Sequence, residues 1–304
     1  MKESVHIQVQ AVLYKNKPEE LAQALQAAEA AAEAAKTAGC RVTLRWGDAT
    51  GEPLFTKQTW TQFTVDLRAF GKASYQFFGK NTGYGGGNNL LAEESEDDFL
   101  LIMNPEILLP PDGILSLLSV FQNPDAGIAE ARQIPVEHPK VFDPVTLETE
   151  WASGACFMIP GPLFRELGGF DTKTFFMYCE DVDLSWRVRE KEKKVFYQPA
   201  VGVYHPRRLN SAGENQASVT EQNHTVLSEA LLAYKWSYPE YARERVRLAE
   251  ALGMPGGREA REIFLQRENE GTLPECRDPE HRIAHITQFP ENGGLVFTGH
   301  RYWL

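Results

Sequence analysis

The chain has 304 residues, which is enough for one large α/β domain with an appendage or for two smaller domains. Its formal net charge of -11 at pH 7 argues against nucleic acid and anionic membrane surfaces as general partners, because both attract proteins through summed lysine and arginine charge. The first residues lack the pattern of a signal peptide, and no apolar run approaches the ~20 residues of a membrane span. We therefore expect a cytoplasmic protein without a transmembrane span.

Strands and helices are predicted to alternate along the first 104 residues. The pattern indicates strands at residues 5–14, 41–48, 75–79 and 98–104, helices at 18–39 and 89–96, and a glycine-rich turn at 81–89. Such alternation is typical of an α/β protein with a mostly parallel central sheet, which binds ligands at the carboxyl ends of its strands. Asp48 and the triplet 104–106 stand at such strand ends and become candidates for ligand contacts.

The order of predicted strands and helices is less regular in the second half of the chain, and the sequence pattern there is as follows. It predicts strands at 151–159 and 195–205 and helices at 111–123, 161–169, 180–193, 221–236 and 239–253, followed by a tail rich in glycine and proline. We therefore predict a main domain at residues 1–205 and a helical C-terminal appendage at 206–304 packed on it. The apolar stripe of 226–236 is a candidate contact for a homodimer, although such stripes more often belong to an intramolecular core.

The glycine-rich turn is open to three interpretations. Gly83 and Gly85 fit a dinucleotide-binding G-x-G-x-x-G register, but Asn88 stands where the third glycine should allow close packing of helix and strand. The glycines could instead make an ordinary tight turn. In the third interpretation, the loop brings its backbone close to a nucleotide-sugar.

The strand-end residues could hold a metal ion and a diphosphate. Glu106 follows a buried strand, where a carboxylate can bind Mg²⁺ or Mn²⁺ and bridge it to a diphosphate, and His205 closes another strand as a possible second ligand. Arg207 and Arg208 could neutralise phosphate oxygens. The alternative is an ordinary Asn-Pro-Glu turn and a surface histidine.

Three acidic residues open the helix predicted at 180–193. Glu180, Asp181 and Asp183 would favour the helix dipole as N-terminal acidic residues, or one of them could act as a general base near the metal. Asp183 is expected to be structural and to pair with Arg187. Phe175, Phe176 and Tyr178 lie just before this segment, and their ring faces, together with that of Trp151, could stack on sugar rings.

Five segments in this order resemble the family 2 glycosyltransferases with the GT-A fold, particularly the bacterial rhamnosyltransferase-like branch: 81–89, 104–106, 151–159, 168–188 and 203–205. The resemblance implies inverting transfer of a sugar from a nucleoside-diphosphate donor to a hydroxyl group, with Asp181 as general base. It implies metal ligands at Glu106, where the family usually has aspartate, and at His205. It further implies donor contacts at Tyr14, Asp48, Asn81, Gly83, Gly85, Asn88 and Asn104, and acceptor contacts at Trp151, Phe176, Tyr178 and Glu180.

The predicted function is therefore that of a metal-dependent glycosyltransferase using Mg²⁺ or Mn²⁺. The branch suggests a thymidine- or uridine-linked donor, with rhamnose as the sugar, and a glycan or lipid-linked acceptor through which the protein could associate peripherally with the inner face of a membrane. Two rival interpretations stay open. One is a non-catalytic carbohydrate-binding or assembly protein on the same fold, and the other is a nicotinamide-dependent oxidoreductase built on the glycine-rich turn.

Overall fold

The computed structural model describes residues 4–137, 141–206 and 219–286, with the backbone alone at 219–223. An eight-stranded sheet runs through the described residues in the order β3-β2-β1-β4-β7-β5-β8-β6. Its strands are β1 (His6–Leu13), β2 (Arg41–Asp48), β3 (Lys72–Phe77), β4 (Phe99–Met103), β5 (Ala126–Ile134), β6 (Glu148–Thr149), β7 (Cys156–Pro160) and β8 (Lys194–Tyr204). The first four positions in the sheet are parallel, whereas β7 runs antiparallel to both β4 and β5.

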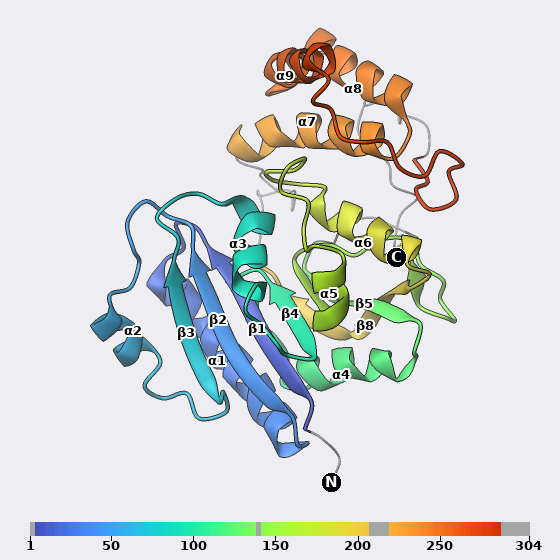
Figure 1. Cartoon of the computed structure of the whole chain (residues 1–304). Coiled ribbons are helices and arrows are strands. Elements are labelled where there is room, and N and C mark those ends of the chain that lie inside the picture. Colours follow the sequence, from blue (N-terminus) through green and yellow to red (C-terminus); the bar gives the residue numbers. More distant parts are fainter. Residues whose placement is uncertain (1–3, 138–140, 207–218, 287–304) are drawn as a thin grey trace.

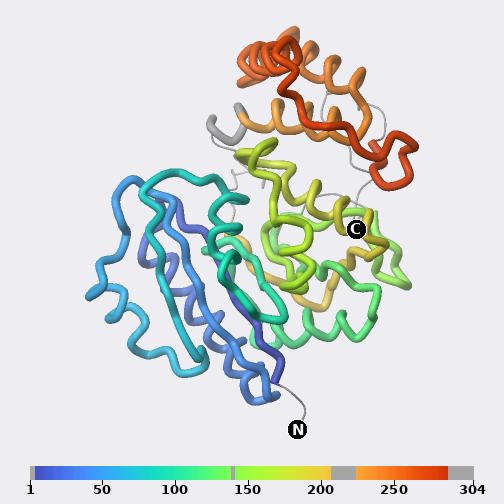
Figure 2. Tube along the Cα trace, viewed as in Figure 1, coloured from blue at the N-terminus to red at the C-terminus, as the bar shows by residue number. Residues whose placement is uncertain are grey.

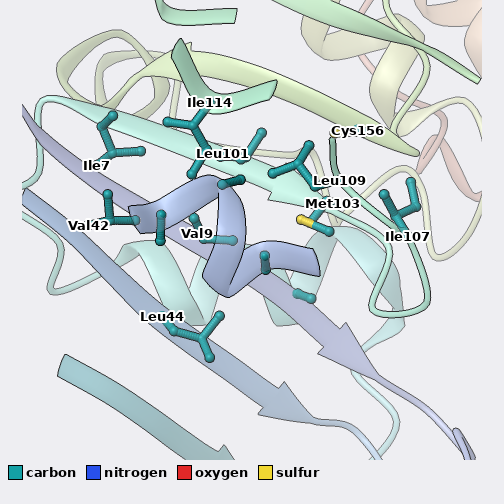
Figure 3. Close-up of a cluster of buried hydrophobic side chains, with 14 of the residues drawn as sticks. Ile7, Val9, Val42, Leu44, Leu101, Met103, Ile107, Leu109, Ile114 and Cys156 are labelled. Carbon is teal, nitrogen blue, oxygen red and sulfur yellow. The ribbon is translucent and has the colours of Figure 1, made fainter. Parts of the chain in front are cut away.

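Helices cover both faces of this sheet (Figure 1). Those preceding the last strand are α1 (Pro18–Thr37), α2 (Lys57–Phe63), α3 (Gly83–Ala92), α4 (Gly113–Ser119), α5 (Gly161–Glu166) and α6 (Glu180–Glu190). Helices α1 and α4 share one core cluster with β1, β2 and β4, and α5 and α6 contribute to a second cluster on the other face. Figure 3 shows the first cluster, in which Ile7, Val42 and Leu101 come from three neighbouring strands and Ile114 from α4.

The chain after β8 forms three helices, α7 (Val219–Lys235), α8 (Pro239–Ala251) and α9 (Gly257–Glu270), which lie together above α6 (Figure 1). Figure 2 shows the segment after α9 running back toward α6, where Arg277 pairs with Glu190 at 2.7 Å. A buried cluster joins these helices to α6, with the rings of Trp186 and Trp236 5.2 Å apart. Residues on both sides of position 205 contribute to this cluster. The predicted division into a main domain and an appendage at that position therefore stays a prediction.

The apolar stripe at 226–236 is buried inside this cluster. Val226, Ala230, Leu231 and Ala233 are at most 1% exposed and pack against α8 and α9. The stripe therefore belongs to the intramolecular core, which was the alternative that the sequence left open, and the homodimer stays a prediction.

Several predicted boundaries also change. Helix α3 begins at Gly83, inside the predicted turn, and β7 begins at Cys156 rather than at residue 151. The chain also contains elements that the sequence pattern did not indicate: α2, β5, β6 and α9. Strand β5 carries the buried Glu130 among its apolar residues, and α9 turns only a narrow apolar face with Ala260 and Phe264 toward the core, so neither gives a strong periodic signal.

Candidate active site

The carboxyl ends of β1, β2, β4 and β8 lie at the same edge of the sheet. Strands β1, β2 and β4 are mutually parallel, and β8 has the same direction because β7 is antiparallel to both β4 and β5 and β8 is parallel to β5. Tyr14, Asp48, Asn104 and His205 follow or end these strands. The tertiary structure therefore collects at one edge the strand-end residues that the sequence indicated.

Asn104, Glu106 and His205 form a polar cluster at the ends of β4 and β8. The Nε2 atom of His205 lies 3.2 Å from Oε1 of Glu106 and 3.3 Å from Nδ2 of Asn104, while its Nδ1 atom lies 3.2 Å from Oε1 of Gln133. His205 is only 7% exposed, so these contacts fix the orientation of its ring. Two residues that are 99 positions apart in the sequence thus offer a carboxylate oxygen and an imidazole nitrogen to one point.

Backbone pairing between two chain segments explains why this cluster forms. The amide of Leu108 donates to the carbonyl of Tyr204 at 2.9 Å, and the amide of Tyr204 donates back at 3.1 Å. The amide of His205 donates to the carbonyl of Ile134 at 2.8 Å. The turn that carries Glu106 is therefore attached to the end of β8, whichever way the side chains rotate.

The cluster offers a partial metal site. A carboxylate and a neutral imidazole suit Mn²⁺, and a carboxylate suits Mg²⁺, which usually keeps waters and substrate phosphates as its remaining ligands. Within residues 4–137, 141–206 and 219–286, no three side chains of histidine, cysteine, aspartate or glutamate converge on a metal position. The cluster thus provides two candidate ligands, the carboxylate of Glu106 and the imidazole of His205.

Asp181 lies in the first turn of α6 and is held by backbone amides. Its Oδ2 atom accepts a hydrogen bond from the amide of Gly154 at 2.7 Å, and its Oδ1 atom accepts one from the amide of Val182 at 2.8 Å. The carbonyl of Ala155, the residue after Gly154, accepts a hydrogen bond from the amide of Asn104 at 2.8 Å. Two adjacent residues, 154 and 155, thus connect Asp181 with the Asn104–Glu106 turn.

The two carboxylates at the start of α6 have raised pKa values. Burial raises the pKa of Asp181, the amides of Gly154 and Val182 partly offset this, and the negative charge of Glu130 adds to it. Burial and the neighbouring charge of Asp181 raise the pKa of Glu180. One oxygen of Glu180 has no hydrogen-bond partner among the described residues. Asp181 is therefore a stronger base than an exposed aspartate.

The aromatic residues around this segment divide into two groups. Phe176 is 42% exposed and Tyr178 is partly buried, so both present ring surface near Asp181 in the sequence. Trp151 and Phe175 are 6% and 2% exposed because they pack in the cluster with α7, α8 and α9. The expectation that Trp151 and Phe175 offer their faces to a sugar is corrected: in this structure they support the segment from inside.

The glycine-rich segment packs closely against protein atoms. A Cβ atom at Gly87 would lie 2.6 Å from Val12 of β1, and one at Gly85 would lie 2.9 Å from Phe170. Gly83 has a φ of +67° and lies against the backbone of Phe176. Helix α3 therefore tolerates its glycines, which are poor helix formers, because no larger residue would fit between the sheet and the 170–176 segment.

Two of the candidate donor residues have their polar atoms occupied. The Oδ1 atom of Asn88, which is fully buried, accepts from Gln10 at 2.9 Å, and its Nδ2 atom donates to the carbonyl of Tyr84 at 3.0 Å. Asn88 therefore holds α3 on β1 and does not face solvent. Asp48 is also fully buried and accepts from the amides of Thr50 and Leu54.

Asp48 organises the loop after β2. Burial alone would raise its pKa, but hydrogen bonds from Leu54, Thr50 and Tyr75 outweigh it and lower the pKa. The carboxylate is therefore ionised and shapes residues 49–55.

The remaining donor candidates are more open. Tyr14 is 44% exposed, and Asn81 is exposed, with its Oδ1 atom accepting from the amide of Gly83 at 3.0 Å. Arg207 and Arg208, the candidates for phosphate contacts, lie outside the described residues.

The sequence placed residues 153–155 in the predicted 151–159 strand and in the family resemblance but gave them no contact role, whereas the structure shows that they connect the two halves of the site. Its amides and carbonyl reach Asp181, Asn104 and the buried Glu130, whose Oε1 atom accepts from the amide of Ser153 at 2.9 Å. The available signal was a run of small residues, Ser-Gly-Ala, directly before a strand. Small residues there let the backbone itself approach the helix and the neighbouring strand.

Two cavities of about 510 and 770 Å³ lie elsewhere on the protein. The smaller is lined by residues around β6, including Phe142 and Arg189, and the larger by residues between the 167–174 loop and the 272–277 loop. Neither is lined by Glu106, Asp181 or His205.

Two solved structures share this architecture over 90% of the chain. One is GalNAc-T7 with UDP, GalNAc and Mn²⁺, with a TM-score of 0.59, 12% identity and 56% of that chain covered. The other is the mannosyltransferase PcManGT from Pyrobaculum calidifontis in complex with GDP-Man and Mn²⁺, with a TM-score of 0.52, 15% identity and 81% of that chain covered. The protein therefore has the GT-A fold of glycosyltransferases, which confirms the predicted fold class.

Curated proteins that resemble the sequence are named rhamnosyltransferases and hexosyltransferases. N-acetylglucosaminyl-diphospho-decaprenol L-rhamnosyltransferase of Mycobacterium tuberculosis is 26% identical over 162 residues, 41% of this chain and 52% of its own length. Rhamnosyltransferase WbbL of Escherichia coli is 24% identical over 137 residues, 35% of this chain and 52% of its own. Low-salt glycan biosynthesis hexosyltransferase Agl10 of Haloferax volcanii is 25% identical over 153 residues, 42% of this chain and 50% of its own.

These relatives agree with the resemblance drawn from the motifs. The chain spans about half the length of the curated relatives it matches. No protein-family model matches it. Together, the relatives and the fold connect the chain with the rhamnosyltransferase-like branch of the family 2 glycosyltransferases.

Proposed function

We propose that the protein is an inverting glycosyltransferase that moves a sugar from a nucleoside-diphosphate donor to a hydroxyl group of a glycan or lipid-linked acceptor. The observation that carries this proposal is the link between the two halves of the site: the adjacent residues Gly154 and Ala155 bond to Asp181 and to Asn104, respectively. A base on one side and a candidate metal pair, Glu106 and His205, on the other is the arrangement that transfer from a diphosphate requires.

Asp181 would act as the general base. Two backbone amides hold its carboxylate, so the group keeps its orientation without a counter-charge that would weaken its basicity. As Asp181 accepts the proton of the acceptor hydroxyl, the hydroxyl oxygen bonds to the anomeric carbon of the donor sugar and the bond from that carbon to the diphosphate oxygen breaks. A single displacement of this kind inverts the configuration and needs one carboxylate, whereas glycoside hydrolysis uses two.

Glu106 and His205 would hold a divalent ion, Mn²⁺ or Mg²⁺. When bound, such an ion neutralises the charge that develops on the departing diphosphate. The Nε2 atom of His205 faces both Asn104 and Glu106, and the Leu108–Tyr204 backbone pair fixes the spacing between the turn and the strand. Glutamate at position 106, one methylene longer than aspartate, reaches His205 in this geometry.

The donor would lie along the edge formed by Tyr14, Asn81 and Asn104, with Asp48 shaping the loop beside it. Thymidine- or uridine-linked sugars, rhamnose in particular, are the proposed donors because the relatives include rhamnosyltransferases. Phosphate contacts by Arg207 and Arg208 stay predictions.

On the acceptor side we propose Phe176, Tyr178 and Glu180. Ring faces at Phe176 and Tyr178 could pack against an acceptor sugar, and the unpartnered oxygen of Glu180 could accept from one of its hydroxyls.

The setting proposed for this activity is the cytoplasm, with access to a lipid-linked acceptor at a membrane face. No helix in the described parts of the chain is long and apolar enough to cross a membrane. Peripheral association would therefore depend on the acceptor, and a vesicle sedimentation assay with and without lipid-linked saccharide would test it.

The decisive experiment is a transfer assay with Asp181→Asn. Wild-type protein is incubated with thymidine and uridine diphosphosugars, Mn²⁺ and candidate acceptors, and product is followed by mass spectrometry. General-base removal should lower the rate of transfer by about 10²–10⁴-fold. Nucleoside-diphosphate binding, measured by calorimetry, should stay unchanged, because Asp181 is not proposed to touch the donor base.

Glu166→Gln is the matched control, since Glu166 is an exposed carboxylate whose partner is Lys191 on the outer surface. It should transfer sugar at the wild-type rate. Full activity in Asp181→Asn would refute the assignment of the base. Binding of nucleotide-sugar without transfer to any acceptor would favour the non-catalytic interpretation.

The oxidoreductase interpretation loses its structural support. The space beside Gly83 and Gly85, the two glycines that fit the dinucleotide register, is filled by Phe176 and Phe170 of the protein itself. A fluorescence titration with reduced nicotinamide dinucleotide should therefore show no saturable binding.

A further inference from the structure

Asp183, two residues after Asp181, is completely buried and has both carboxylate oxygens filled. Its Oδ2 atom accepts from Nε of Arg187 at 2.7 Å, and its Oδ1 atom lies 2.6 Å from Nζ of Lys235 and accepts from Nε1 of Trp236 at 3.1 Å. The pair with Arg187 was expected from the sequence and is confirmed. The contacts with Lys235 and Trp236 come from the last residue of α7 and the residue that follows it, more than 50 residues later.

Lys235 also reaches the loop that precedes α6. Its Nζ atom lies 2.7 Å from Oδ2 of Asp171 and 5.5 Å from the centre of the Phe175 ring. One buried ammonium group therefore contacts the loop at residue 171 and the helix at residue 183. The stretch between these two points contains Glu180 and Asp181.

A second tether comes from the same helix. The hydroxyl of Ser228 donates to the carbonyl of Met177 at 2.6 Å. The two residues that follow Met177, Tyr178 and Cys179, have φ values of 70° and 65°, a backbone conformation that costs non-glycine residues free energy. A segment in this conformation persists only where its surroundings hold it, and here α7 supplies the contacts.

On one side of the 171–183 segment, no apolar packing among the described residues accompanies the ion pairs of Lys235. A cavity of about 770 Å³ borders the ion cluster and is lined by Asp171, Arg187 and Lys235 among others. Because this side is open, the ion pairs are the attachment of the loop to α7 there.

We propose that Lys235 is a positioning residue for the proposed reaction: by binding Asp171 and Asp183 together, it holds the 171–183 segment in the conformation that aims Asp181 at the acceptor. The C-terminal helices are thereby a working part of the active site. This inference rests on the proposed function.

The test compares Lys235→Met, Lys235→Arg and Ser228→Ala in the full chain, with steady-state kinetics and hydrogen exchange as readouts. In Lys235→Met, Asp181 should be displaced, and a small misplacement of a reacting group should lower kcat by about 10²-fold. The KM for the nucleotide-sugar should change little. Lys235→Arg should recover much of the loss because it restores the positive charge. Amide exchange at residues 175–183 should accelerate in Lys235→Met and, more weakly, in Ser228→Ala.

Val246→Ala is the control for a purely structural role. Val246 is 1% exposed in the buried cluster that also contains Phe175 and Val182, so its truncation should reduce stability, but its apolar side chain can form neither an ion pair nor a hydrogen bond with residues 171–183. It should keep kcat and the exchange rates of 175–183. Wild-type kcat in Lys235→Met, or an equal loss of kcat in Val246→Ala, overturns the inference.

The readouts separate this inference from the proposed function. If wild-type protein transfers no sugar in any assay, the proposed function fails and the kinetic role of Lys235 fails with it. The exchange rates of 175–183 then still report whether Lys235 holds the segment. If wild-type protein is active and the exchange rates do not change in Lys235→Met, the inference fails alone.

Discussion

Helix α6 carries two aspartates on different faces, and the two carboxylates have different surroundings. On the face toward the sheet edge, Asp181 is partly exposed and is held by the amides of Gly154 and Val182. On the face toward α7, Asp183 is fully buried and is bound by the cations of Arg187 and Lys235. Asp181 can therefore be protonated without breaking an ion pair with these cations, as its proposed role as a base requires, whereas Asp183 cannot accept a proton without the loss of two ion pairs.

Within a single turn of α6, the fold thus places one aspartate where it could act as a base and another where it can only stabilise the structure. Amide donors fix a carboxylate without neutralising it, whereas paired cations fix it and remove its reactivity. The following predictions test this difference, from the largest expected effect to the smallest.

The first prediction concerns stability. Asp183→Asn leaves Lys235 and Arg187 buried without their shared partner, which should lower the free energy of unfolding by about 3–5 kcal/mol. Asp181→Asn should leave it unchanged or raise it at pH 7, because it removes a carboxylate whose pKa is raised by desolvation and for which the described residues provide no counter-cation. Urea unfolding followed by circular dichroism measures both, and equal losses in the two variants would remove the distinction between the faces.

The second prediction concerns the metal pair. Glu106→Gln removes the proposed carboxylate ligand and should weaken the Mn²⁺-dependent part of nucleoside-diphosphate binding at least ~10-fold. Calorimetry with and without Mn²⁺ measures the effect. Asp112→Asn, a change of an exposed carboxylate next to α4, serves as the control, and an equal loss in both variants would contradict the assignment.

The third prediction concerns the pH dependence of transfer. The base must be ionised, and burial raises the pKa of Asp181 above the ~4 of an exposed aspartate. The acid limb of kcat/KM should therefore lie well above pH 4, with activity lost as the pH falls through the raised pKa. A pH–rate profile between pH 4 and 9 tests this, and an acid limb at the ordinary carboxylate value would show that the base is solvated.

The raised pKa values affect stability in the opposite direction: activity should rise with pH, whereas the free energy of unfolding should fall. Between the ordinary carboxyl pKa and the raised values of Glu180 and Asp181, the folded state binds more protons than the unfolded state. Unfolding free energy should therefore fall as the pH rises through that window, and Asp181→Asn should flatten the fall.

The smallest predicted effect involves Asp171. Partial burial would raise its pKa, but the hydrogen bond from Lys235 outweighs burial and the pKa is about 2. The folded-state pKa lies below the unfolded value of ~3.9, so the stabilisation is present above pH ~4 and is lost as the pH falls toward 2. Because the group is only half buried, we expect less than ~1 kcal/mol, measured as the difference between wild type and Asp171→Asn in acid titrations of stability.

The first elements of the fold were predictable from local pattern. The 5–14 and 41–48 strands and the 18–39 helix lie within two residues of β1, β2 and α1, because alternation, the early Pro18 and the terminal Gly39 are strong local signals. Helix α3 was misplaced since glycine disfavours helices locally, and only contact with Val12 and Phe170 requires it there.

The candidate site divides in the same way. Glu106, Asp181 and His205 were identified through motifs whose order resembles a family, and the structure brings Glu106 and His205 into contact. The contacts of residues 153–155 and the role of Lys235 could not be predicted, because they depend on pairs separated by 23 to 64 residues, for which no local periodicity exists.

The sequence by itself determined which residue types stand at strand ends and at the start of α6, since hydrophobic alternation and turn residues act over a few neighbours. Only the tertiary structure decided which carboxylate faces a cation and which faces amides. That choice depends on α7 packing against α6, and the environment of a buried charge is set by atoms distant in the chain.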